Sequence, residues 1–263
     1  MILTNLTKIN QPIIVNVVTD KNQGGYLNGQ QRLIDSCIKY NLNHVVFRGE
    51  YPPSCPSHKD HPYAFKIYAL NYVRKNILTN CKDWDKQIII WADSPVWFCK
   101  DPTPLVEAII KDGLVTWGAG ETGATLARYC SDDCLKILHL TREEAKEIPL
   151  LCGSIYGFNM KNQDCSTILD SLLLYQLRGA FIGPTMNTAS PKGMAHHYGA
   201  GYRGRPEYKC SDDPQCWGHR HDETVISYLV WKHKIGHTYP LGQFFCGYSP
   251  TMSETVVACS QGC

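Results

Sequence analysis

Asp93 is the first residue whose position suggests chemistry. It follows a run of three isoleucines and a tryptophan, Ile88–Trp91, after a single alanine. Such a run is typical of a strand that is buried on both faces, as the strands of parallel sheets are. Pro95 can donate no ladder hydrogen bond and is expected to end the strand nearby. Asp93 is therefore predicted at the carboxyl end of a buried strand, where open α/β sheets bind ligands and a carboxylate can hold a metal ion or a hydroxyl.

The densest group of titratable side chains lies in one short segment: His219, Arg220, His221, Asp222 and Glu223. Apolar residues at helical spacing follow from residue 224, so this segment is expected to lead into a helix. A helix amino terminus favours an acidic residue, and Asp222 could therefore act only as a cap. Two carboxylates, two histidines and an arginine within five residues favour a binding or catalytic site instead.

The elements that must position these residues alternate between strand and helix. Strands are predicted over 11–20, 44–47, 87–92, 113–117 and 154–160. Helices are predicted over 29–40, 63–78, 101–105, 141–148 and 166–177, and from 224 onward. The helix at 141 carries a capping box, Thr141 to Glu144. This alternation predicts an α/β fold in which helices cover both faces of a mostly parallel, Rossmann-like sheet. We expect a single domain over residues 1–263, with a flexible, Gly- and Pro-rich loop at 179–218.

Composition restricts the expected partners, the cellular location and the state of the cysteines. The net charge is +2 and no basic run is present, so charge does not point to a nucleic-acid partner. No apolar stretch approaches the ~20 residues of a membrane span, and the amino terminus lacks the pattern of a secretory signal. A cytoplasmic location is expected. The 13 cysteines form no paired Cys-x2-Cys signature, and mostly reduced, buried thiols are predicted. A zinc site of Cys210, Cys216, His219 and His221 is the alternative.

Several short motifs occur in an order that resembles one family. They are Tyr26 behind the first strand, Pro62-Tyr-Ala-Phe-Lys66, Trp91-Ala-Asp93, Asp101-Pro-Thr-Pro-Leu105, Gly153-Ser-Ile-Tyr-Gly-Phe-Asn159 and His221-Asp-Glu-Thr224. Over residues 11–235 this order is similar to that of nucleotide-sugar glycosyltransferases of the GT-A fold. The resemblance implies an enzyme, a hexosyl- or pentosyltransferase, that moves a sugar from a nucleoside-diphosphate sugar to a hydroxyl acceptor. It implies a nucleotide-binding half at 1–115 and an acceptor and catalytic half at 116–263.

The resemblance places Asp93 first in the Asp-x-Asp motif with which such enzymes hold a divalent metal on the donor pyrophosphate. Here the motif continues as Ser94-Pro95, so the second carboxylate is missing. A bound Mn²⁺ or Mg²⁺ would need oxygen ligands from elsewhere or from the phosphates. Either His221 or His219 completes the metal site, or the enzyme works without metal.

The resemblance also assigns roles at the donor sugar. Asp222 would bind donor hydroxyls, and Glu223 would lie near the anomeric carbon, as a base toward the acceptor or as a stabiliser of an oxocarbenium-like transition state. The predicted donor-binding residues are Val18, Thr19, Asp20, Tyr26, Lys66, Asp93, Ser94, Asn159 and Arg205. Arg205 belongs to the flexible loop, which could close over the diphosphate or grip an anionic acceptor.

Two other functions stay open at this point. One is a metal-dependent phosphoesterase or other hydrolase built on Asp93, His219, His221 and Asp222, with Asp20 as a further carboxylate. The other is a catalytically inactive module that binds a nucleotide-sugar. For a transferase, the acceptor could be a polysaccharide, a protein side chain or a hydroxylated DNA base.

Overall fold

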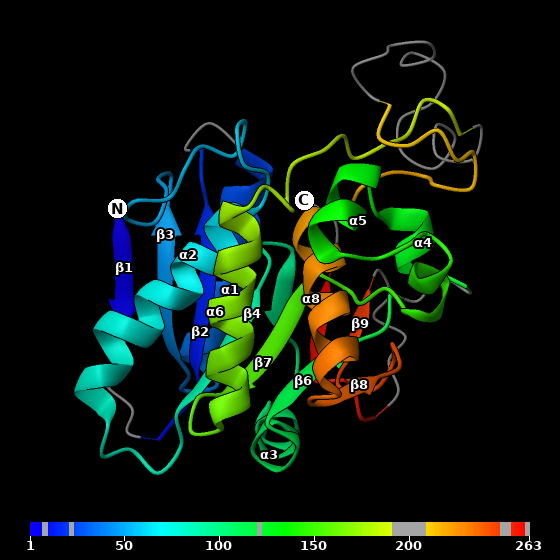
Figure 1. Cartoon of the computed structure of the whole chain (residues 1–263). Coiled ribbons are helices and arrows are strands. Elements are labelled where there is room, and N and C mark those ends of the chain that lie inside the picture. The colour runs from blue at the N-terminus through cyan, green and yellow to red at the C-terminus, as the bar shows by residue number, and fades with distance from the viewer. Residues whose placement is uncertain (7–9, 21–23, 120–122, 191–208, 248–253, 261–263) are drawn as a thin grey trace.

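A central sheet of 7 strands organises the chain, in the order β1-β3-β2-β4-β7-β6-β8. The computed structural model describes residues 1–6, 10–20, 24–119, 123–190, 209–247 and 254–260. In Figure 1 the sheet runs from β1 at the left to β8 at the right, with α2, α6 and α8 in front of it. The strands are β1 (Ile2–Asn5), β2 (Ile13–Val18), β3 (Asn43–Arg48), β4 (Ile88–Ala92), β6 (Leu114–Trp117), β7 (Ile155–Asn159) and β8 (His237–Tyr239).

The sheet is mixed. Strands β3, β2 and β4 are parallel, and β6 is parallel to β8, whereas β7 runs antiparallel to both of its neighbours, β4 and β6. The edge strand β1 is antiparallel to β3. The predicted α/β fold is therefore confirmed, and one set of its parallel strands, β3, β2 and β4, ends beside Asp93. A smaller sheet joins β5 (Val96–Phe98), β10 (Ala258–Ser260) and β9 (Phe245–Gly247).

Alternate residues of the strands serve two separate cores. In β4, Ile89 and Trp91 face one core, while Ile88 and Ile90 face the other. All five residues of β4 are buried, as the unbroken apolar run predicted. The first core lies against α2 (Ala64–Tyr72), α6 (Gln163–Leu177) and α8 (His221–His233), and the second against α1 (Gly24–Lys39) and α3 (Thr103–Asp112). Helices thus cover both faces, as expected.

Other elements differ from the sequence prediction: some are shorter than predicted, and some were not predicted at all. The predicted helix at 63–78 continues beyond α2 as a π-helical turn, Val73–Ile77, and a 3-10 turn, Leu78–Cys81. The helix predicted at 141–148 is only a 3-10 turn, Glu144–Glu147, although Thr141 and Glu144 do form the reciprocal capping bonds. Two short helices were not predicted, α4 (Leu126–Tyr129) and α5 (Asp132–Leu138). Residues 191–208 of the predicted loop lie outside the described residues.

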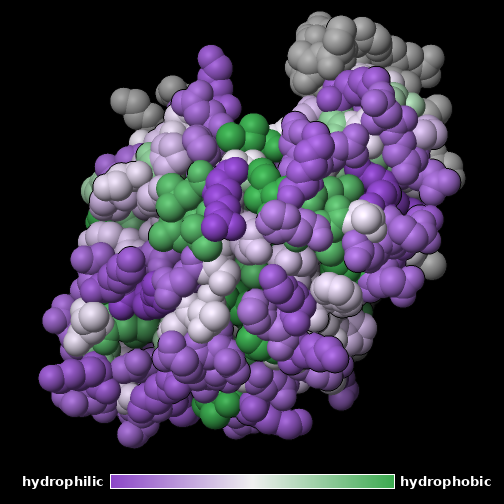
Figure 2. Space-filling model, in the orientation of Figure 1, coloured by the Kyte–Doolittle hydropathy of each residue, from purple (hydrophilic) through white to green (hydrophobic). Residues whose placement is uncertain are grey.

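A membrane span requires a helix that is both long and apolar. None of the described helices is long enough and apolar enough to cross a membrane. Figure 2 shows a largely hydrophilic surface on the face seen in Figure 1, with hydrophobic patches in its upper middle, between α2 and α8. The 12 cysteines among the described residues are all free thiols, and 8 of them are buried, as predicted.

Candidate active site

A cavity of about 400 Å³ lies where the parallel strands end. Its walls come from the carboxyl ends of β2 and β4, the first residues of α1, α2 and α8, and Ser154 before β7. This volume is within the range of small-molecule sites, roughly 300–1,000 Å³. The cavity contains Asp93 and the segment Arg220–Glu223, so two stretches 130 residues apart in sequence meet there, as the topology of an open α/β sheet allows.

Lys66 is the charged centre of this cavity. Its side chain is only 3% exposed, and its Nζ lies 3.2 Å from Oδ1 of Asp93 and 3.1 Å from Oδ2 of Asp222. The same ammonium donates to the carbonyl of Gly153 at 2.8 Å. Burial by itself lowers the pKa of Lys66, but the carboxylates of Asp222 and Asp93 outweigh it and the pKa is raised, so Lys66 is positively charged.

The two aspartates are each held by one further donor. The indole Nε1 of Trp91 donates to Oδ1 of Asp93 at 2.8 Å, and the hydroxyl of Tyr156 donates to Oδ2 of Asp222 at 2.7 Å. Burial raises the pKa of Asp93, and the nearby Lys66 opposes that rise. Asp222 does not cap α8, because its carboxylate is taken up by Lys66 and Tyr156. The capping position before the helix is Arg220, whose side chain makes no cap bond.

Glu223 differs from Asp222 in its surroundings. Its Oε1 accepts a hydrogen bond from the backbone N–H of Gly153 at 3.0 Å, with no lysine bonded to it among the described residues. Burial, reinforced by the charge of Asp222, raises the pKa of Glu223 to about 7. A carboxyl with such a pKa can both take up and release a proton near neutrality.

Gly153 leaves room for this glutamate. A Cβ atom built on Gly153 would lie 2.5 Å from Cγ and Oε1 of Glu223, closer than real Cβ contacts come. The glycine therefore allows the carboxylate to rest directly against the backbone before β7, where the N–H can bond it.

The two histidines lie in different places. His221 is at the cavity wall, stacked on Tyr63 with ring centroids 5.1 Å apart, and its ring nitrogens contact the carbonyl of Phe181 at 2.9 Å and the hydroxyl of Thr185 at 3.2 Å. Burial lowers the pKa of His221 to about 4, so the ring is neutral. His219 does not line the cavity. Its Nε2 lies 3.0 Å from the carbonyl of Ala180 and its Nδ1 accepts from the N–H of Ser131 at 3.4 Å.

The three predicted metal ligands, Asp93, His221 and His219, do not all lie together, since only the first two line the cavity. Mn²⁺ and Mg²⁺ take oxygen-rich ligand sets, and Asp93 and Asp222 already share the ammonium of Lys66. Among the described residues, the close group of three metal-binding side chains is Cys130, Cys134 and His219, not a group around Asp93. The structure thus separates His219 from Asp93. It also does not assemble the alternative zinc set of Cys210, Cys216, His219 and His221.

Of the other predicted donor-binding residues, some line the cavity and the rest do not lie among the described lining residues. Val18, Thr19, Tyr26 and Ser94 line the cavity together with Lys66 and Asp93. Asp20 is exposed and follows Thr19 without lining the cavity, and Arg205 lies outside the described residues. Asn159 pairs with Ile88, the first residue of β4, so it lies at the opposite end of the strand from Asp93. Because β7 is antiparallel, its carboxyl end points away from the cavity, which a parallel strand would not do.

Sequence reasoning did not single out four residues that line the cavity, His58, Tyr63, Ser154 and Thr185, or Tyr156, which bonds Asp222. Arg220, which also lines it, was included only as a member of the titratable segment. Tyr63, Ser154 and Tyr156 belong to motifs that were recognised, and aromatic or hydroxyl side chains within them were the available signal. His58 lies in a Pro-rich segment, between Pro52 and Pro62, for which no helix or strand was predicted. It packs edge-on against Tyr63, with ring centroids 4.9 Å apart, and so extends the aromatic wall that ends at His221.

Comparisons with known proteins bear on the fold. No protein-family model matches the sequence, and no curated protein matches it. Among solved structures, the chain is similar to a glycosyltransferase involved in the glycosylation of the major capsid of PBCV-1, with 11% identity and a TM-score of 0.51 over 95% of this chain and 93% of that one. Mouse xyloside xylosyltransferase 1 shows 10% identity and a TM-score of 0.45, over 96% of this chain and 97% of that one. At 11% identity the likeness to the PBCV-1 enzyme concerns the fold alone: the chain shares the fold of that glycosyltransferase.

Proposed function

We propose that the protein is a glycosyltransferase, which moves a sugar from a nucleoside-diphosphate sugar to a hydroxyl acceptor. The observation that carries the proposal is the arrangement of Asp93, Lys66, Asp222 and Glu223 in one cavity at the strand ends. Asp93 and Asp222 supply oriented carboxylates that can bind sugar hydroxyls. Glu223, with a pKa of about 7, supplies a separate carboxyl group for proton transfer. The fold shared with a glycosyltransferase supports this reading.

In the proposed mechanism, Asp222 and Asp93 orient the donor. Each aspartate uses one oxygen, Oδ2 of Asp222 and Oδ1 of Asp93, for Lys66 and its second donor. The other oxygen of each has no hydrogen-bond partner among the described residues and can accept from a ribose or sugar hydroxyl. Lys66 keeps both carboxylates in place and offsets their charge, which would otherwise repel a diphosphate.

Glu223 is proposed as the base toward the acceptor. It must be ionised to take the proton of the attacking hydroxyl, and its pKa of about 7 lets it do so at neutral pH. Arg220 lines the same cavity and is the cation we propose for the diphosphate leaving group, since Lys66 is already paired. Because Lys66 already pairs both aspartates, we propose that donor binding persists without Mn²⁺ or Mg²⁺.

The test is a screen of nucleoside diphosphates and of hexose and pentose nucleotide-sugars, by thermal shift and by slow donor hydrolysis. Each donor is measured with Mn²⁺, with Mg²⁺ and with chelator. We expect stabilisation by at least one donor and its hydrolysis in all three conditions. Stabilisation without hydrolysis or transfer would instead indicate an inactive binding module, and no stabilisation by any donor would contradict the proposal.

The same preparation decides between transfer and phosphoester hydrolysis. The phosphoesterase alternative requires several metal ligands together, whereas His219 lies away from Asp93 and Asp222. We therefore expect no turnover of simple aryl phosphates.

The PBCV-1 glycosyltransferase, to which this chain is similar with a TM-score of 0.51, is involved in the glycosylation of the major capsid. Protein-linked glycans are therefore the first acceptors to test, ahead of polysaccharides and hydroxylated DNA. The cytoplasmic location stays a prediction.

A further inference from the structure

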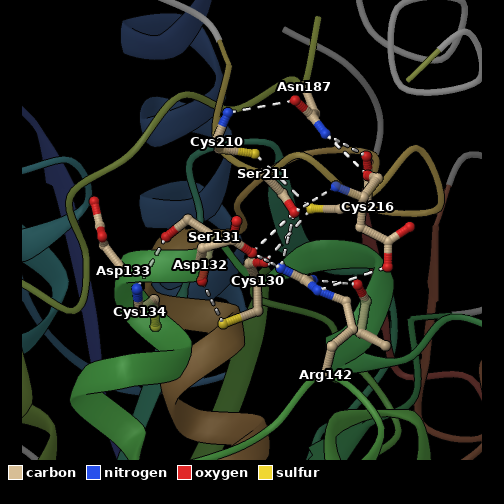
Figure 3. A network of polar contacts seen from close by, with 12 residues as sticks. Cys130, Ser131, Asp132, Asp133, Cys134, Arg142, Asn187, Cys210, Ser211 and Cys216 are labelled. Carbon is tan, nitrogen blue, oxygen red and sulfur yellow. Dashed lines mark hydrogen bonds and ion pairs between the residues drawn. The ribbon is translucent and has the colours of Figure 1, made fainter. Parts of the chain in front are cut away.

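A second group of reactive side chains lies outside the cavity, at the start of α5. Cys130, Cys134 and His219 place one ligand atom each within 4.8 Å of one another, and all three residues are buried. The two cysteines flank the beginning of α5, where Ser131 caps the helix by accepting from the N–H of Cys134. Figure 3 shows the thiols of Cys130 and Cys134 at this helix start.

The orientation of His219 is that of a metal-binding imidazole. Its Nε2 lies 3.0 Å from the carbonyl of Ala180, which can only accept, so Nε2 carries the proton. The lone pair is then on Nδ1, which faces the N–H of Ser131, between the two cysteines. A hydrogen bond from the second ring nitrogen to a backbone carbonyl is the usual support of a histidine ligand. The bond from Ser131, at 3.4 Å, is long, so a metal ion can replace it at small cost.

We propose that Cys130, Cys134 and His219 bind one zinc ion. Thiolate sulfur and imidazole nitrogen form the ligand set that zinc prefers. With Zn–S bonds of about 2.3 Å and Zn–N bonds of about 2.1 Å, tetrahedral ligand atoms lie roughly 3.6–3.8 Å apart. The observed spread of up to 4.8 Å therefore needs a closure of about 1 Å. The two thiols release their protons to solvent as the ion binds, and a small ligand such as water takes the fourth position.

This ion would fasten the start of α5 to the segment that enters α8. Trp217 and Arg220 donate backbone N–H groups to the carbonyls of Arg128 and Tyr129, so the two segments already run side by side. His219 lies two residues before His221 and three before Asp222, the acid that pairs with Lys66. The site is structural and does not depend on the proposed transferase function.

The other cysteines nearby serve a different role. Cys210 and Cys216 face each other, with sulfur atoms 3.9 Å apart, and Cys216 contacts the carbonyls of Cys130 and Gly218. Arg142 lies among them and donates to the carbonyl of Cys130 at 2.9 Å. This network holds the backbone around the proposed site without adding a ligand atom to the group of three.

The experiment measures metal in the intact 263-residue chain. Protein purified without chelator is analysed for metal content, and apoprotein is titrated with Co²⁺. We expect one zinc ion per chain and a thiolate-to-cobalt charge-transfer absorption. The variants Cys134→Ala and His219→Ala should lose the bound zinc, whereas Cys37→Ala, which removes an equally buried thiol from α1, should keep it.

Two results would overturn the proposal: wild-type protein that neither contains zinc nor gives the cobalt absorption, or Cys134→Ala and His219→Ala variants that retain a full equivalent of zinc. The cobalt spectrum needs only wild-type protein, so a variant that fails to fold does not remove the test. Because metal content is read rather than transfer, this result and that of the donor screen can fail independently.

Discussion

Two networks in this protein each place one basic side chain between two aspartates, and the two differ in exposure. In the first, Lys66 lies between Asp93 and Asp222, with side-chain exposures of 3%, 27% and 4%. In the second, Arg142 lies between Asp132 and Asp213, with exposures of 15%, 44% and 36%. The arginine also donates to the carbonyls of Ala127 and Cys130 and to Ser211, as Figure 3 shows in part.

The comparison of these two networks shows how burial changes the effect of an ion pair on its surroundings. Arg142 fastens loops and α5 together, and solvent screens its charges. Lys66 has little access to solvent, so its charge and those of the two aspartates depend on one another. The Arg142 network stabilises the fold, whereas the Lys66 network holds carboxylates at the edge of the cavity and shifts the pKa of the groups around it.

Lys66→Met tests this contrast most strongly. It leaves buried carboxylates without their cation, and we expect a loss of about 3–5 kcal/mol in unfolding free energy, together with the loss of donor binding. Arg142→Met, the control, should cost about 1–2 kcal/mol and leave donor binding intact. Chemical denaturation and thermal shift with donor measure both. Equal losses in the two variants would show that the buried network has no special role.

Glu223→Gln should abolish most turnover without loss of the fold. Removal of a positioned base is expected to lower donor turnover about a thousandfold while donor binding persists. The control Glu144→Gln changes an exposed capping carboxylate, bonded to Thr141, and should leave turnover unchanged. Unaltered turnover in Glu223→Gln would rule out its role as base.

The pH dependence of the wild type follows from the same glutamate. The base must be ionised, so kcat/KM should rise through a pKa of about 7.

The stability of the fold should also depend on this glutamate. Because the pKa of Glu223 in the folded protein lies above that in the unfolded chain, the folded protein holds the extra proton between about pH 4.5 and 7. The stability that Glu223 contributes is therefore present at low pH and lost as the pH rises through that window. At pH 8, Glu223→Gln should be more stable than wild type by about 2 kcal/mol after allowance for solvent screening. A stability difference that grows toward acidic pH would contradict this sign.

Gly153→Ala should displace Glu223 without changing any ionisable group. The added methyl would come within 2.5 Å of the glutamate side chain, so we expect about a tenfold loss of turnover with little change in donor binding. Gly118→Ala is the matched control, since a Cβ there meets no atom within 4 Å. Steady-state kinetics should separate the two, and a similar loss in both would mean that Glu223 is not held by this contact.

Tyr156→Phe is expected to have the smallest effect. It removes the 2.7 Å bond to Asp222, which is worth about 1–3 kcal/mol to a charged acceptor, and should weaken donor binding several-fold. Tyr239→Phe removes a bond of the same length to Asp112, away from the cavity, and should leave donor binding unchanged. If the two variants bind donor equally well, the hydroxyl of Tyr156 does not position Asp222.

Much of the fold could be predicted because it rests on local pattern. The unbroken apolar runs of β2 and β4 and the helical spacing in α1 and α6 are visible in the sequence. The antiparallel direction of β7 could not be read from its own residues, since a buried strand looks the same in either direction. Because β7 is antiparallel to β4, Asn159, which was predicted at the donor site, lies at the opposite end of the sheet. The short strands of the second sheet, three residues each, carry too little pattern to be recognised.

The sequence by itself determined that Asp93 ends a buried strand and that Asp222 and Glu223 begin a helix, because burial and helical periodicity are properties of neighbouring residues. Only the tertiary structure decided what each group contacts. Lys66 could be read as a surface charge, yet it pairs with Asp93, 27 residues away in the sequence, and with Asp222, 156 residues away. His219, two residues from His221, turns to the two cysteines of another helix start. The pKa of Glu223 likewise depends on burial and on the position of Asp222, and both arise only when the separate segments pack together.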